Sequence, residues 1–148
     1  MHLVPVHRRF PRAGIDPIDD AESALLAVSM AVTHPLRHET IVVLLDDARR
    51  GIGIVAVTGT RPPDAVVGVL DTVLDTVLDS VPDSVPESVG AVVLASVRPG
   101  GAADGADIDR WLEMTDLADQ HGVELLEWFV VADAVSCPRD LLGEPPRW

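Results

Sequence analysis

The sequence predicts an α/β fold in which a mixed β-sheet lies between helices within a single domain. Short continuous apolar runs, typical of buried strands, alternate with longer segments whose apolar residues recur every three or four positions, as in amphipathic helices. Two of the apolar runs are joined by a turn, which predicts a hairpin and antiparallel pairing in part of the sheet. The chain has 148 residues, 47% of them hydrophobic. This length supports one substantial core but not two comfortable domains.

The first predicted helix ends at about Thr33. Asp16-Pro17 or Asp19 can cap its start, because an aspartate accepts hydrogen bonds from the free amides and proline suits the first turn. Its apolar stripe consists of Ala24, Leu25, Val28, Ala31 and Val32. Residues 1–17 are predicted to form an N-terminal arm, so the domain is expected to begin at residue 18.

A β-hairpin follows this helix. Residues 41–45 are apolar throughout, and a run that is apolar on both faces predicts a strand in the middle of a sheet. Arg49-Arg50-Gly51 is typical of a turn, and residues 52–58 form the second predicted strand, which closes at Gly59-Thr60. The two strands should therefore pair antiparallel.

Residues 61–80 predict a second helix, and its last part belongs to a four-residue repeat. From Val69 to Ser88 the chain reads VLDT, VLDT, VLDS, VPDS and VPES. Because a period of four drifts slowly around a helix of about 3.6 residues per turn, Asp71, Asp75 and Asp79 should form one acidic stripe. We interpret the stripe as the solvated face of an amphipathic helix, and a docking surface for a basic partner is the alternative.

The remaining elements alternate between strand and helix. In order, they are a short acidic connection broken by Pro82 and Pro86, a buried strand at residues 91–95, a helix that ends at Gly122, strands at 123–131 and 134–136, and an extended tail at 143–148. The helix follows a glycine-rich turn at residues 99–105, and Asp104 or Asp107 can cap it. The whole order indicates an α/β sandwich built on a mixed sheet.

Composition limits the classes of partner. The formal net charge is −13, and the chain contains arginine but no lysine. Binding to nucleic acid depends on a basic surface that neutralises phosphates, so this balance argues against a nucleic-acid partner. No apolar run approaches the roughly 20 residues that span a bilayer, so no membrane partner is expected. The single cysteine, Cys137, can form no internal disulfide, and the expected compartment is the cytoplasm.

The most informative segment is residues 94–110, which read LASVRPGGAADGADIDR. It resembles the JAMM motif of MPN-type metalloproteins, also called JAB-type metallopeptidases, and in particular their RadC branch. That motif is a His-x-His-Pro-x-Gly turn, seven spacer residues after the second His, a Ser, two residues and an Asp. Here Ser96 and Arg98 stand in place of the two histidines, Ala106 stands in place of the Ser, and Asp109 is retained. The spacing fits without a gap.

The resemblance covers about residues 21–142 and implies an MPN fold, a cytidine-deaminase-like α/β/α sandwich, for residues 18–142. Outside the motif it rests on residues in matching order, namely Glu39, 41–46, Arg49-Arg50, Gly59-Thr60, Pro99, Gly101, 122–126, Val135-Ser136 and Leu141-Leu142. In the family, the residue matching Glu39 is the general base that activates zinc-bound water. The residue matching Asp109 is a metal ligand.

The replacements imply that the zinc chemistry of the family has been lost. A catalytic zinc needs three protein ligands and an open position for water. Ser96 is a poor neutral ligand, and Arg98 is a permanent cation with no lone pair to donate. We therefore expect no metal, no cofactor and no active catalytic residue in the degenerate pocket of Glu39, Ser96, Arg98, Ala106 and Asp109. Arg98 is predicted to take the place of the metal and to pair with Asp109, Glu39 or both.

A rebuilt metal site, with zinc as its cofactor, is the alternative. Its candidate ligands are His34, His38, His121 and Cys137. Pro35 breaks the segment between the first two histidines, so they lack the spacing of ligands on one helix face. Cys137 is also a candidate nucleophile, although a lone cysteine is usually a packing residue.

Three functional hypotheses follow. The first is a pseudoenzyme, a catalytically inactive RadC-like domain that acts as a scaffold through a protein partner or self-association, with the terminal Trp148 as a candidate anchor. The second is an active zinc-dependent metallopeptidase or isopeptidase with a rebuilt site. The third is a pocket in which Arg98 binds an anion such as phosphate or a carboxylate.

Overall fold

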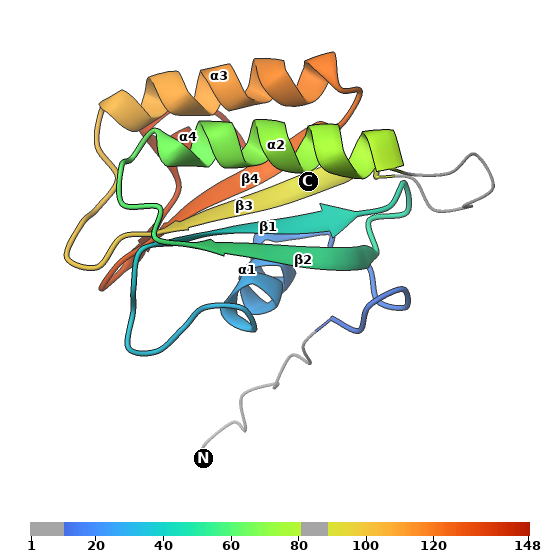
Figure 1. Cartoon of the computed structure of the whole chain (residues 1–148), viewed down its shortest axis with the longest axis horizontal. Coiled ribbons are helices and arrows are strands. Elements are labelled where there is room, and N and C mark those ends of the chain that lie inside the picture. The colour runs from blue at the N-terminus through green and yellow to red at the C-terminus, as the bar shows by residue number, and fades with distance from the viewer. Residues whose placement is uncertain (1–10, 81–88) are drawn as a thin grey trace.

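A computed structural model describes residues 11–80 and 89–148 and has an α/β fold with a five-stranded mixed sheet (Figure 1). The strands are β1 (Glu39–Leu45), β2 (Gly51–Thr58), β3 (Ala91–Val97), β4 (Glu124–Val131) and β5 (Val135–Ser136). Their order across the sheet is β2-β1-β3-β4-β5. Strands β3 and β4 pair in parallel, whereas the other neighbours pair antiparallel. The predicted α/β class, mixed sheet and hairpin are therefore confirmed.

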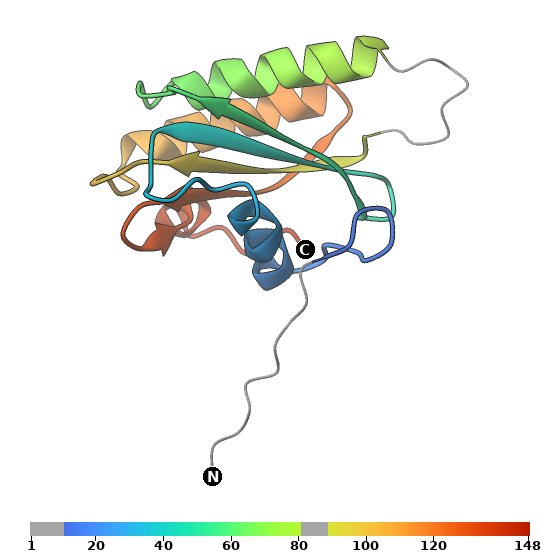
Figure 2. The same cartoon turned by 60° about the horizontal axis from the view of Figure 1, so that its bottom comes forward.

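The helices are α1 (Ala21–Ser29), α2 (Ala65–Ser80), α3 (Ala106–Gln120) and α4 (Pro138–Leu142). Helices α2 and α3 lie side by side on one face of the sheet, and α1 covers the other face (Figure 2). Helix α4 packs against α3 and β4. The sequence did not predict α4, because a five-residue helix is too short to show an apolar period. Figure 2 shows the resulting three layers.

Buried side chains form one core cluster on each face of the sheet. The cluster under α2 and α3 includes Val42, Leu70, Leu74, Leu94, Trp111, Met114 and Trp128. The cluster under α1 includes Ala24, Val28, Ile41, Val43, Val93, Leu126 and Phe129. All residues of β1 and β3 are buried, as expected for central strands that are apolar on both faces.

The capping residues of two helices differ from the prediction. Asp20 caps α1 and forms a capping box with Ser23, because its carboxylate accepts the backbone N–H of this third helical residue at 2.8 Å. Gly105 precedes α3 without a side-chain cap, although the carboxylate of Asp104 accepts the N–H of Ala106 at 2.9 Å. The acidic connection predicted around Pro82 and Pro86 and the start of the N-terminal arm lie outside the described residues.

The segment after α4 lies against the domain. The guanidinium of Arg147 stacks on the Trp111 ring, 4.2 Å from its centroid, and donates to the carbonyl of Leu125 at 2.9 Å. Trp148 is half-buried and packs against the core cluster under α1. The indole that the sequence offered as an anchor for a partner therefore contacts the core of its own chain.

Candidate functional site

Three residues of the degenerate pocket predicted from the sequence, Glu39, Ser96 and Arg98, lie at one end of the sheet, where β1 begins and β3 ends (Figure 1). Glu39 pairs with Val97, and the adjacent pair is Thr40 with Ser96. Arg98 follows directly after β3. Side chains of successive strand residues point to opposite faces, so Glu39 and Ser96 lie at the same end of the sheet but on different faces. The sequence placed Glu39 and Ser96 in one pocket, but it did not predict that their side chains would lie on opposite faces of the sheet.

Glu39 lies on the α1 face. Its carboxylate accepts a hydrogen bond from the backbone N–H of Thr33 at 2.8 Å and is 3.3 Å from the hydroxyl of the same residue. The residue is 1% exposed. These bonds attach the segment after α1 to the beginning of β1, so the position assigned to the general base holds a structural carboxylate enclosed by the fold.

Ser96 lies on the opposite face, beneath α3. Its hydroxyl accepts a hydrogen bond from the indole Nε1 of Trp128 at 3.0 Å, and Trp128 is fully buried. Because a buried indole N–H without a partner is costly, this bond gives Ser96 a packing role. The Trp128 ring also lies 5.7 Å from the guanidinium carbon of Arg98, a favourable cation–π distance.

Arg98 forms a two-point ion pair with Asp107 in the first turn of α3. Its two terminal nitrogens lie 2.7 and 2.8 Å from the two carboxylate oxygens. The Asp107 side chain is fully buried and the Arg98 side chain is 12% exposed. The predicted pairing of Arg98 with Asp109 or Glu39 is therefore wrong, although Arg98 does bind a carboxylate.

Asp107 is the centre of a larger network. It also accepts hydrogen bonds from Arg110 at 2.8 Å and from the backbone N–H of Asp104 at 2.9 Å. Arg110 extends the network to Asp64, just before α2, at 2.7 Å. Burial opposes ionisation of Asp107, but the hydrogen bonds from Arg98, Asp104 and Arg110 outweigh it and hold its pKa below the usual value. One carboxylate thus joins β3, α3 and the start of α2.

Ala106 and Asp109 are exposed on the outer side of α3. The inner side of this helix is set by its buried residues, Asp107, Trp111, Met114 and Ala118. Two residues along an α-helix correspond to a rotation of about 200°, so a helix that buries Asp107 turns Asp109 outward. Because Trp111 and Met114 pack against the sheet, α3 is rotated so that Asp107 faces inward, whereas the motif spacing had indicated Asp109.

The candidate ligands of a rebuilt zinc site are dispersed. His34 lines a hollow beside α1 and β5, whereas His38 lines a separate hollow beside Pro99. Burial, with a smaller contribution from Glu127, raises the pKa of the Cys137 thiol to about 12. A thiol that stays protonated near neutral pH is a poor nucleophile and a poor ligand. Among the described residues, His121 is the one of the four that belongs to a group of three potential metal ligands.

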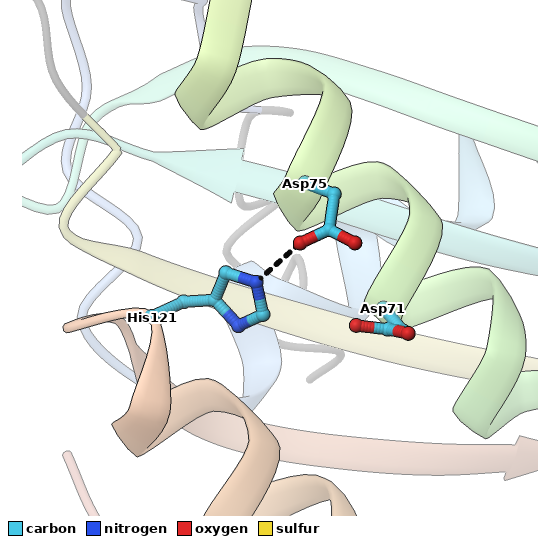
Figure 3. A group of neighbouring side chains, drawn as sticks. All are labelled: Asp71, Asp75 and His121. Atoms are coloured by element: carbon cyan, nitrogen blue, oxygen red, sulfur yellow. Dashed lines mark hydrogen bonds and ion pairs between the residues drawn. The ribbon is translucent and has the colours of Figure 1, made fainter.

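His121, at the end of α3, faces two aspartates of α2 (Figure 3). Its Nε2 is 2.7 Å from Asp75, and potential ligand atoms of Asp71, Asp75 and His121 all lie within 4.8 Å of one another. The hydrogen bond to Asp75 raises the pKa of His121, helped by a bond to the Leu117 carbonyl. The sequence showed the aspartate stripe and the histidine separately but gave no sign that α2 and α3 would bring them together.

An apolar hollow lies between α1 and β2. It has a volume of about 200 Å³ and is lined by Pro11, Ala13, Ile18, Ala27, Met30, Val43 and residues 51–54. Met30 and Ile54 at its rim are 50% and 40% exposed. Large apolar side chains are therefore exposed to solvent in this hollow, beside an outer strand of the sheet.

No protein-family model matches the chain, and no curated protein matches it either. Among the described residues, no helix has the length and apolar character needed to cross a membrane.

The Arg98–Asp107 pair can be tested with two neighbouring aspartates on the same helix. We expect Asp107→Asn to lower the free energy of unfolding by about 3 kcal/mol, because it leaves the mostly buried Arg98 without its charged partner, while Arg110 keeps Asp64. Asp109→Asn, the matched control on the exposed side, should change it by less than about 0.5 kcal/mol. Urea denaturation of wild type and both variants measures these changes in the free energy of unfolding.

The same variants have a defined pH dependence. Because the pKa of Asp107 is lowered by folding, its stabilising contribution is complete above the ordinary aspartate pKa of about 4 and is lost as pH falls through the lowered value. The difference in the free energy of unfolding between wild type and Asp107→Asn should therefore become smaller as the pH is lowered below about 4. Equal effects of the two substitutions at pH 7 would contradict the assignment.

Proposed function

We propose that this chain is a catalytically inactive RadC-like MPN domain that binds another protein through the outer edge of β2. The observation that carries the inactive part of this proposal is the Arg98–Asp107 ion pair at the end of β3, where the second histidine of the family motif would stand. A fixed guanidinium repels a divalent cation and offers it no lone pair. The motif spacing and the helix-flanked mixed sheet support the family part of the proposal.

The environment of Glu39 also favours an inactive domain over a metallopeptidase. A general base must reach the water or substrate proton that it abstracts. Glu39 is buried, its oxygens face the amide and hydroxyl of Thr33, and it lies on the opposite face from Ser96. The chemistry of the family requires these positions to converge on one atom.

The hypothesis of an anion pocket at Arg98 is weaker for a different reason. Both terminal nitrogens of Arg98 already bind the Asp107 carboxylate. An external phosphate or carboxylate would have to displace an internal carboxylate that two arginines hold in a buried place. The Asp107 carboxylate therefore occupies the position on Arg98 that this hypothesis assigned to an external anion.

The outer edge of β2 is the surface best suited to a protein partner. β2 is the outermost strand on its side of the sheet. Its first residue, Gly51, already accepts a hydrogen bond from the N–H of Gly14 at 2.8 Å, so the edge considered for a partner is residues 52–58, which contain no charged residue and no proline. Edge strands are usually protected by such residues against pairing with other chains. Ile54 lies opposite Val43 in the β1–β2 pair, so its exposed side chain faces the apolar hollow.

The proposed occupant is an extended apolar segment of a different protein. Such a segment can pair with β2 through its main chain and place alternate side chains in the hollow beside Met30 and Ile54. A second copy of this chain is a poorer occupant, because each copy carries a net charge of −13 and the copies repel. The proposed compartment is the cytoplasm, which is consistent with one cysteine and no internal disulfide.

Catalytic inactivity can be tested by direct assay. The wild-type chain and Glu39→Gln, each with added ZnCl₂, are compared for hydrolysis of peptide and isopeptide substrates. We expect no turnover above buffer for either protein, because Glu39 is enclosed and Arg98 is bound to Asp107. Zinc-dependent turnover by the wild type that Glu39→Gln abolishes would favour the metallopeptidase hypothesis instead.

The binding surface can be tested with a photo-crosslinking amino acid in place of Ile54. Leu112 on α3, which is 44% exposed, is the matched control position far from β2. We expect position 54 to form an adduct with an extended apolar segment of one other protein, mapped by mass spectrometry, and position 112 to form none with that protein. Identical adducts from both positions, or adducts between two copies of this chain alone, would contradict the proposed occupant.

A further inference from the structure

We propose that Asp71, Asp75 and His121 form a binding site for a first-row divalent cation, with zinc as the best match, that links α2 to α3 (Figure 3). The potential ligand atoms of these three side chains lie within 4.8 Å of one another. Ligand bonds of about 2.0–2.2 Å place the donors of a tetrahedral zinc roughly 3.4 Å apart. Donors that lie up to 4.8 Å apart must therefore approach by at most about 1.4 Å to bind one tetrahedral ion.

The orientation of His121 suits a metal ligand. Its Nδ1 is 2.9 Å from the carbonyl oxygen of Leu117. A carbonyl only accepts hydrogen bonds, so Nδ1 carries a proton. Nε2 lies 2.7 Å from a carboxylate oxygen of Asp75, which also only accepts, so without metal Nε2 donates a proton to Asp75, and a bound cation would take the place of that proton. A histidine whose second nitrogen donates to a backbone carbonyl is the usual arrangement of a ligating histidine, because that bond fixes the ring and its tautomer.

The charges around the cluster favour a cation. Asp71 and Asp75 are exposed and stand one turn apart on α2, a spacing at which two carboxylates repel. Among the described residues, no arginine forms an ion pair with either of them. The adjoining groove between α2 and α3 is lined by Asp71 together with Glu113 and Asp116, which add negative charge from the second helix. A divalent cation would relieve this repulsion.

The donor set indicates which cation. Calcium and magnesium prefer oxygen ligands alone, whereas an imidazole nitrogen with carboxylate oxygens suits zinc and its first-row neighbours. Three protein ligands leave one position of a tetrahedral zinc for water. The cation would cross-link two helices through Asp75 and His121, which are 46 positions apart in the chain.

This site is independent of the proposed function. It lies at the end of α3, whereas Asp107 lies in the first turn of the same helix, so the two are at opposite ends of the domain (Figure 1). Neither Arg98 nor Glu39 belongs to it. The absence of peptidase activity would therefore leave the cation site untouched, and failure of the cation site would leave the inactive-domain proposal untouched.

The test is calorimetric titration of the tag-free full chain with ZnCl₂ near pH 7.5, repeated with MgCl₂. Wild type, His121→Gln and Asp71→Asn are compared with the control Asp109→Asn, which removes an exposed carboxylate at the other end of α3. We expect wild type and Asp109→Asn to bind one zinc with similar affinity and to gain Tm as zinc is added. His121→Gln and Asp71→Asn should bind at least about tenfold more weakly, and magnesium should give no comparable signal.

Two results would overturn the proposal. One is a wild-type chain that binds no zinc. The other is zinc binding that His121→Gln and Asp71→Asn both retain at wild-type affinity, since the cation would then be held elsewhere. Thermal denaturation without metal shows whether each variant is folded, and Asp71→Asn, which alters an exposed side chain, keeps the test valid if His121→Gln proves unstable.

Discussion

The ion pair between Arg98 and the buried carboxylate of Asp107 is the interaction on which the rest of the site depends. It connects the end of β3 to the first turn of α3, and Arg110 carries the connection on to Asp64 before α2. Burying a charge is costly unless hydrogen bonds compensate for it, and here two guanidinium groups and a backbone amide do so. Once Asp107 faces inward, the rotation of α3 is fixed, and Asp109 must face solvent.

The alternation of side chains along β1 and β3 imposes the second constraint. Glu39 belongs to the α1 face and holds Thr33, whereas Ser96 belongs to the α3 face and holds the indole of Trp128. Each accepts a hydrogen bond from a polar group inside the fold. Two residues of the pocket predicted from the sequence thus stabilise packing on opposite faces of one sheet.

The sequence predicted the strands and the longer helices well, because their patterns are local. Continuous apolar runs identified β1 and β3, and the period of Val and Leu identified α2. Details decided by packing could not be predicted in this way. The choice of Asp107 over Asp109 depends on how Trp111 and Met114 meet the sheet, and the approach of Asp75 to His121 depends on two helices lying side by side. Helix α4 has too few residues to show a period.

The most direct test of the central claim is a double-mutant cycle between Arg98 and Asp107, measured by urea unfolding at neutral pH. The single variants Arg98→Ala and Asp107→Ala and the double variant give the coupling free energy of the pair. We expect a favourable coupling of at least about 1.5 kcal/mol, as for a buried hydrogen-bonded charge pair. The same cycle between Arg98 and Asp109 should give a value within about 0.5 kcal/mol of zero. Coupling of Arg98 to Asp109, with none to Asp107, would show that Asp107 is not the partner of Arg98.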